Sequence, residues 1–285
     1  MIIIVYQAKM NNLPDELIDA VKGFVIFKPS CYNILQSAVD LWCQDREEAI
    51  NKYGHISLWD TSLITDMQTL FLNQRKFNDD ISNWNVSSVT NMNNMFHGAY
   101  IFNQPIGKWD VSSVTDMNNM FRGALIFNQP IGKWDVSSVT DMHDMFRNAQ
   151  SFNQPIGNWD VSSVTDMSRM FSCAQSFNQP IGNWNVSSVI YMLYMFRETN
   201  LFNQPIGDWD MRCVTETSGM FYGTNAFNQP IGKWDVSSVT DMSFMFNRAQ
   251  VFNQPIGDWN TSSVIYMCSM FDGAKAFNQS LDNWS

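Results

Sequence analysis

Two columns of acidic residues recur at one constant interval along the chain and are the first candidates for chemistry. The first carboxylate follows a tryptophan, and the second lies six residues later. The columns comprise Asp60, Asp110, Asp135, Asp160, Asp210 and Asp235, and then Asp66, Asp116, Asp141, Asp166 and Asp241. Calcium prefers carboxylate oxygens, but carboxylates also accept backbone hydrogen bonds in turns and at helix N-termini. We favour the turn role over a calcium site, and we predict that the columns interact within a coil because both change in the same repeats.

Other residues with reactive side chains fit structural roles better than catalytic ones. Pairs such as Met117 and Met120 are soft ligands of the kind that bind copper(I), but they lie on an apolar stripe where methionine commonly fills a core. The histidines, His55, His97 and His143, are too scattered for a metal site. No nucleophile motif or phosphate-binding glycine loop occurs. The sequence therefore predicts no enzyme, no cofactor and no metal site.

The positions at which the repeats differ are the remaining candidates for a binding site. Two of them lie between the paired methionines, and two follow the Met-Phe dipeptide. Leu193, Tyr194 and Phe244 are apolar at these positions, where most repeats carry polar residues. Because an exposed aromatic patch often marks an interface, we predict that these three side chains contact a protein partner. Drift within a redundant array is the alternative explanation.

The charge of the chain argues against strongly anionic partners. The 285 residues contain 17 Lys and Arg against 27 Asp and Glu, a formal charge of −10, whereas nucleic acid and anionic membranes attract basic surfaces. The first residue after Met-Phe forms a column of mixed character that includes His97, Arg122, Arg147, Ser172, Arg197, Tyr222 and Asp272. A basic column with so many interruptions does not predict a groove that follows phosphates. No nucleic-acid partner is expected.

A strict repeat must position all of these residues. Phenylalanine recurs at positions 77, 102 and 127 and onward at the same interval to 277, and tryptophan does so from position 59 to 284, without an insertion or deletion. Such a constant period is typical of stacked coils that contact only their neighbours. The asparagine after each of these phenylalanines predicts an asparagine ladder, because an amide can bond to its own coil and to the next.

The pattern within one repeat, residues 102–126, predicts a short helix and a short strand. Apolar residues from 114 to 124 recur mostly every three residues, as on one face of a helix, with Ser113 as its N-cap and Gly123 at its end. Residues 106–111 read as a short extended segment. The sequence therefore predicts an α/β fold, a leucine-rich-repeat-like solenoid of 25-residue coils with one strand and one helix in each.

Residues 1–55 precede the repeats and are predicted to form a helical cap on a solenoid of about nine repeats, residues 56–285. One helix is expected over residues 13–21 and a second from about 32 to 51, ended by Gly54. The second helix is expected to bury Ile34, Leu35, Ala38, Leu41, Trp42, Ala49 and Ile50. Terminal coils of a solenoid need such cover for their apolar interior.

Both ends of the chain suggest further interactions. Residues 13–18, LPDELI, are similar to the start of an F-box, the helix that docks substrate receptors onto ubiquitin ligases, although a plain capping helix is the preferred interpretation. The sequence ends in mid-coil at Trp284 and Ser285. End-to-end self-association there is the alternative to an edge that is blunted by its polar residues.

Targeting features and cysteine usage indicate an intracellular protein without a membrane span. The N-terminus lacks a basic segment followed by a long apolar run, as a secretory signal requires, and no stretch reaches the roughly 18 apolar residues of a membrane span. The cysteines are Cys31, Cys43, Cys173, Cys213 and Cys268. Their odd number and irregular placement predict free thiols in a reducing compartment.

The motif FNQPIGxWDVSSVTDMxxMFxxA resembles the 25- to 26-residue repeats of the BspA-like bacterial surface-protein family, a leucine-rich-repeat relative of unknown function. The match covers about residues 56–285. The resemblance implies an interaction solenoid, frequently at a bacterial surface, with no catalytic residues. Because this sequence shows no signal peptide, lipobox or anchor, we expect a non-catalytic intracellular scaffold that binds a partner protein. An F-box-type adaptor for a ubiquitin ligase and a surface adhesin are the alternatives.

Overall fold

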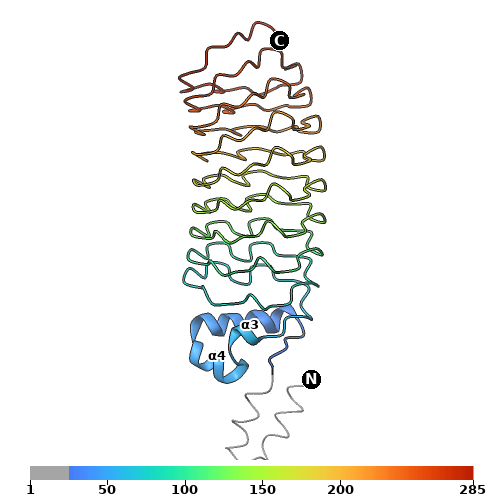
Figure 1. Cartoon of the computed structure of the whole chain (residues 1–285), viewed down its shortest axis with the longest axis vertical. Coiled ribbons are helices and arrows are strands. Elements are labelled where there is room, and N and C mark those ends of the chain that lie inside the picture. Colours follow the sequence, from blue (N-terminus) through green and yellow to red (C-terminus); the bar gives the residue numbers. More distant parts are fainter. Residues whose placement is uncertain (1–25, 285) are drawn as a thin grey trace, which may run out of the picture.

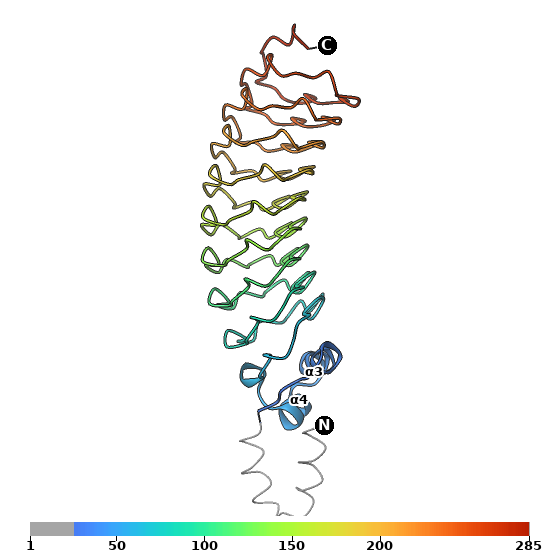
Figure 2. The same cartoon turned by 90° about the vertical axis from the view of Figure 1, so that its right-hand side faces the viewer.

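The computed structural model describes residues 26–284, in which the chain winds as a column of stacked coils (Figure 1). Helix α3 (Tyr32–Gln44) and helix α4 (Arg46–Tyr53) lie at the N-terminal end of this column (Figure 2), followed by the 3-10 turn η1 (Ile56–Leu58). From there to residue 284 the chain forms no further helix and no continuous strand. Isolated parallel bridges join neighbouring coils, from Asp66–Asn91 to Asp241–Tyr266.

Each coil is a series of tight turns. In residues 102–126, the N–H groups of Trp109, Val114, Met120 and Ala124 each donate to the carbonyl three residues earlier, at 2.9–3.2 Å. This bond defines a β-turn. The expected fold, a leucine-rich-repeat-like α/β coil with one strand and one helix, is therefore wrong. The coils do stack in register with the sequence repeat, but the unit that stacks is a chain of turns.

The backbone of the segment predicted as a helix shows why that prediction failed. Its alternate N–H groups donate to the next coil, as Met117 does to the Asp141 carbonyl at 3.1 Å, and not to a carbonyl four residues earlier. Asn119 and Gly123 have φ values of 54° and 70°, which an α-helix does not contain. Ser113 donates its hydroxyl to a neighbouring coil and caps no helix. An apolar spacing of three fits successive turns as well as it fits a helix.

The interior consists of columns of identical side chains. The ring of Phe121 lies 5.6 Å and 5.7 Å from its equivalents in the adjacent coils and 4.0 Å from Phe127. Met117 and Met120 are fully buried, as a core role requires. The indole N–H of Trp134 donates to the Ile106 carbonyl of the preceding coil at 3.2 Å. Aromatic stacking and buried hydrogen bonds thus run the length of the column.

The predicted asparagine ladder is confirmed. The Asn128 N–H donates to the side-chain oxygen of Asn103 at 3.0 Å, and the Gln129 amide donates to the Asn103 carbonyl and side-chain oxygens at 2.9 Å and 3.0 Å. The same bonds recur from coil to coil. Each asparagine from Asn78 to Asn253 therefore accepts a backbone N–H of the next coil, whereas the expected bond of its amide within its own coil does not occur among residues 26–284.

The N-terminal helices differ in detail from the single helix expected over residues 32–51. The helix is interrupted at Asp45, whose carboxylate accepts the Glu48 N–H at 3.0 Å and caps α4. Gly54 ends α4 as predicted, with φ 73°. Of the residues expected to be buried, Ile34 and Ile50 are 41% and 42% exposed, because they lie on the outer sides of the two helices. Buried residues of α3 are Leu35, Ala38, Val39 and Trp42.

Helix α3 packs directly on the first coil. Its Tyr32 hydroxyl lies 3.0 Å from the Thr69 hydroxyl, and the Trp42 indole N–H donates to Asp79 at 2.9 Å. The Trp42 ring is 5.9 Å from that of Trp59, which begins the tryptophan column. The predicted helix over residues 13–21 and its LPDELI segment lie outside the described residues. None of the helices within residues 26–284 has the length and hydropathy to cross a membrane.

Candidate functional site

The four variable positions of each coil form one surface, here called the turn face. It consists of residues 118, 119, 122 and 123 and the equivalent residues of the other coils. The second and fourth positions have a left-handed backbone in every coil from Thr69 to Gly273. Because these turns alternate between bonds to their own coil and bonds to the next, the side chains of adjacent coils interlock at the surface.

The three residues predicted to contact a partner lie on the turn face, but less exposed than expected. Leu193, Tyr194 and Phe244 are each half-buried. The Tyr194 ring covers Gly219 of the next coil so closely that a Cβ atom on this glycine would lie 2.1 Å from the ring. Phe244 occupies the equivalent position one coil beyond Gly219. Within residues 26–284 no ring contact joins Tyr194 to Phe244, so the three do not form one aromatic cluster.

Tyr194 belongs instead to a continuous arrangement that we call the arginine–tyrosine ladder: Arg169, Tyr194, Arg197, Tyr222 and Arg248. The guanidinium carbons of Arg169 and Arg197 each lie 5.9 Å from the centre of the Tyr194 ring. Those of Arg197 and Arg248 lie 5.4 Å and 5.8 Å from the Tyr222 ring. Each ring therefore contacts two cations at distances typical of cation–π interactions.

The ladder carries more positive than negative charge. Arg197 pairs with Glu198 at 3.3 Å, whereas Arg169 and Arg248 have no acidic side chain within 4 Å among residues 26–284. Asp272 lies in the coil after Arg248 and accepts its backbone N–H through a carbonyl. On a protein with a formal charge of −10, this is a local basic surface.

The turn face is different in the two coils directly before the ladder, in a group that we call the carboxylate clamp: Arg122, Asp144 and Arg147. Asp144 is only 4% exposed, and its carboxylate oxygens lie 3.7 Å from Arg122 and 3.3 Å from Arg147. Two arginines thus share one buried carboxylate. Burial and the positive charge of Arg122 lower the pKa of the adjacent His97, and Asp144 opposes this shift.

The ladder was missed in the sequence because each column was examined separately. Arg169 and Tyr194 belong to one column, Arg197 and Tyr222 to another, and Arg248 to a third. Tyr222, which interrupts the basic column in the sequence, joins two arginines in space. Reading the columns together would have shown the alternation of arginine and tyrosine.

The two acidic columns form turns, as the preferred interpretation predicted. The Asp135 carboxylate accepts the Ser137 N–H at 3.1 Å, and that of Asp116 accepts the Asn118 N–H at 2.9 Å. The Ser137 bonds lower the pKa of Asp135, whereas burial raises that of Asp116. No hydrogen bond joins the two columns in the described part of the chain, so their expected interaction within a coil stays a prediction.

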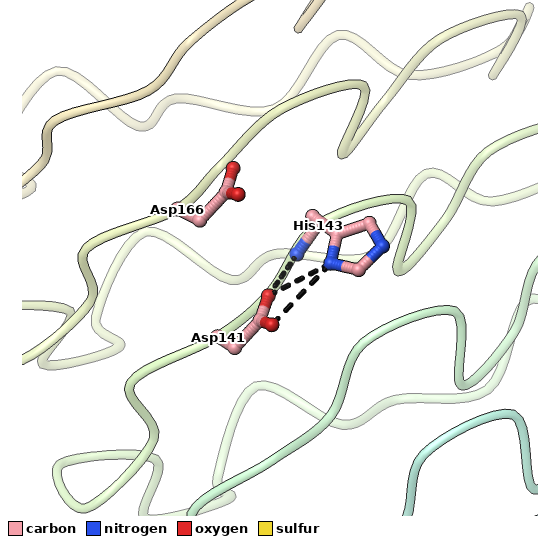
Figure 3. A group of neighbouring side chains, drawn as sticks. All are labelled: Asp141, His143 and Asp166. Carbon is pink, nitrogen blue, oxygen red and sulfur yellow. Dashed lines mark hydrogen bonds and ion pairs between the residues drawn. The ribbon is translucent and has the colours of Figure 1, made fainter.

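Asp141, His143 and Asp166 form the one group within residues 26–284 whose side chains could hold a metal ion (Figure 3). One ligand atom of each lies within 4.8 Å of the others, a juxtaposition that the sequence analysis missed when it treated the histidines as scattered. Figure 3 shows the His143 ring turned toward Asp141, with Nδ1 3.0 Å from the carboxylate.

Internal bonds already account for this group. Burial acts to raise the pKa of Asp141, but the His143 hydrogen bonds outweigh it and lower that pKa, while the same bond raises the pKa of His143. The Asp166 carboxylate accepts the Ser168 N–H at 2.8 Å. Asp141 and His143 therefore form a hydrogen-bonded pair, and Asp166 forms an ordinary turn beside it.

Comparison with known proteins gives a family and no function. No curated protein matches the chain. A family model described as "Mycoplasma protein of unknown function, DUF285" matches in three tandem segments, residues 43–149, 126–224 and 203–285. This repeat family is related to the BspA-like repeat proteins, so the expected resemblance holds at that coarser level. Because the three segments together cover more than half of the sequence, the chain belongs to the DUF285 family.

Proposed function

We propose that this protein is a non-catalytic interaction scaffold that presents its turn face to a partner protein. The phenylalanine, tryptophan and methionine columns fill the interior, and the asparagine and aspartate columns bond to the backbone. The turn face is a surface on which neighbouring coils differ, as they also do at the column of Ile101, Ile126 and Val251. The similarity of the repeat to BspA-like surface proteins supports the same role, because that resemblance implies an interaction array.

The left-handed backbone beneath large side chains of the turn face is the observation that carries the proposal. Arg169, Tyr194 and Phe244 have φ values of 54°, 53° and 59°. Asparagine and glycine adopt this conformation with less strain, and Asn119 and Gly219 do so at equivalent positions. Bulky side chains held against such strain concentrate at functional sites. We therefore infer that their role is binding and not support of the fold.

Affinity capture tests the proposed function. The immobilised full chain is incubated with cell lysate, and bound proteins are identified by mass spectrometry. The triple variant Leu193→Ser, Tyr194→Ser and Phe244→Ser is expected to lose the partner while keeping its circular dichroism spectrum and melting temperature.

A matched control replaces three exposed apolar residues outside the turn face, Ile101, Ile126 and Val251, with serine. This control is expected to retain the partner. Equal capture by both variants would contradict the proposal. Capture that depends on residues 1–55 and includes ligase subunits would favour the adaptor role instead.

A further inference from the structure

We propose that the arginine–tyrosine ladder binds an extended acidic segment of the partner protein, with carboxylates placed against Arg169, Arg197 and Arg248. This inference rests on the proposed interaction role and adds the chemistry of the partner. It is derived from the contrast between the ladder and the carboxylate clamp, which lie on the same face of the same repeat.

The clamp shows what arginine binds on this face. Asp144 provides a carboxylate to Arg122 and Arg147 from a left-handed position with φ 56°. At the equivalent position, the next two coils carry Arg169 and Tyr194. The chain thus supplies a carboxylate in the clamp and omits it in the ladder. Paired charge-assisted bonds to a carboxylate are the strongest interactions available to arginine.

The tyrosine rings keep the ladder arginines ready for such a ligand. Arg197 lies between Tyr194 and Tyr222, and its side chain remains 40% exposed. Arg248, also exposed, rests on Tyr222 and over Gly273. Stacking on a ring limits the rotamers of a long side chain, so less conformational entropy is lost on binding.

The dimensions fit a short peptide. Arg169 and Arg248 are three coils apart, and equivalent buried phenylalanines in these coils lie 5.6–5.9 Å apart. The ladder therefore spans roughly 17 Å, the length of about five residues of extended chain. Because Arg197 already pairs with Glu198, the carboxylates of a ligand gain most binding energy from Arg169 and Arg248.

A peptide fits better than single-stranded nucleic acid. Bases would need free aromatic faces for stacking, but Tyr194 and Tyr222 each already contact two arginines. The formal charge of −10 also repels a densely charged polymer at longer range. Three arginines on a net acidic protein suit a few carboxylates at close contact.

Fluorescence anisotropy with the full chain tests the inference. The probe is a fluorescein-labelled decapeptide of alternating glutamate and serine, compared with its glutamine–serine counterpart and a single-stranded thymidine decamer. We expect the glutamate peptide alone to bind, and the double variant Arg169→Gln and Arg248→Gln to weaken it about tenfold. Arg212→Gln is the matched control, because Arg212 lies outside the turn face, where it pairs with Asp210 at 2.6 Å.

A reciprocal pair of variants tests the comparison with the clamp. Tyr194→Asp puts a carboxylate at the position of Asp144 and is expected to block the probe, whereas Tyr194→Asn, which has the same shape without the charge, is expected to bind it better than Tyr194→Asp does. Asp144→Asn frees the arginines of the clamp and is expected to increase probe binding. Melting temperatures confirm that each variant folds.

The inference is overturned if the glutamate peptide does not bind, if it binds the Arg169→Gln and Arg248→Gln variant as well as the unmodified protein, or if the thymidine decamer binds equally well through the same arginines. If lysate capture still depends on Leu193, Tyr194 and Phe244 while the glutamate peptide does not bind, the interaction role stands and the acidic specificity is wrong.

Discussion

The carboxylate clamp and the arginine–tyrosine ladder lie on the same face of the repeat and differ in one respect. In the clamp, Asp144 neutralises part of the charge of Arg122 and Arg147. In the ladder, tyrosine rings replace the carboxylate, and Arg169 and Arg248 have no acidic partner within 4 Å in residues 26–284. At the position of Asp144, the ladder coils carry Arg169 and Tyr194, so the carboxylate that the clamp arginines share has no counterpart at that position of the ladder.

The clamp and the ladder are built on the same framework of bonds and buried side chains. Asn103 and Asn153, from a clamp coil and a ladder coil, accept the same bonds from the next coil. Phe121 and Phe196 are buried in the same column. The side chains of the turn face can therefore differ from coil to coil while the bonds that hold the coils together stay the same.

The largest expected effect comes from breaking the framework itself. A Cβ atom on Gly107 or Gly157 would lie 2.1 Å or 2.2 Å from the proline carbonyl of the next coil, and this carbonyl is backbone that cannot move aside. Gly107→Ala strains the coils of the clamp and Gly157→Ala those of the ladder. Each is expected to destabilise the protein by about 2–3 kcal/mol in urea unfolding. The exposed Asn158→Ala serves as control, and unequal losses would show that the two regions do not share one framework.

The next effect comes from opening the clamp. Asp144→Asn keeps the shape of a buried side chain but removes its ion pairs with Arg122 and Arg147. We expect a loss of about 1–2 kcal/mol of unfolding free energy. Tyr194→Asn, at the equivalent position of the ladder, removes no such bond and is expected to cost less. A larger loss for the ladder variant in the same unfolding experiment would reverse this ranking.

A smaller effect is expected from removing one arginine–tyrosine contact of the ladder. The coupling free energy between Arg197 and Tyr222, measured with Arg197→Met, Tyr222→Leu and the double variant, is expected to be about 0.5–1 kcal/mol for this partly exposed pair. Arg212 and Tyr222 belong to different surfaces and provide the uncoupled control. A coupling near zero for Arg197 would mean that the stacking does not order the arginine.

The smallest effect concerns the pH dependence of the clamp. Burial and Arg122 lower the pKa of His97 in the folded protein, so folding favours the neutral ring. Its contribution to stability is therefore present above the unfolded pKa of about 6.5 and is lost as the pH falls through the lower folded value. Asp144→Asn removes the charge that opposes this shift. We expect NMR titration to show a still lower His97 pKa in that variant, and an increase would contradict the arrangement.

The sequence was sufficient for the period, the buried columns and the asparagine ladder, because side chains that recur at a strictly constant interval must meet their own equivalents. It was insufficient for the conformation of the coil. Apolar residues at Met117, Met120 and Phe121 satisfy a helix and a series of turns alike. Only the left-handed backbone distinguishes the turns from a helix. A residue such as Tyr194 gives no sign of that backbone in the sequence, because tyrosine rarely adopts a positive φ.

The candidate site was identified in part for the same reason. Tyr194 was found because it departs from the repeat, which needs no knowledge of the coil. Its arginine neighbours were not found, because their proximity depends on bonds between coils that a helix would not make. Leu193 and Phe244 stay predictions: both lie half-buried on the turn face, and no ring contact joins Phe244 to Tyr194 within residues 26–284.

Backbone N–H groups in the repeat alternate between two classes, those that donate to the next coil and those that donate within their own coil. In each turn segment, Met117, Asn119, Phe121 and Gly123 donate outward to the next coil, while Met120 and Ala124 donate within their own. One inserted residue would exchange these two classes throughout the segment and leave every bond aimed at the wrong coil. Whole repeat units can be added or removed without that exchange. The length of the turn face can therefore change only in discrete steps, each one coil thick, with a new set of turn-face residues at every step.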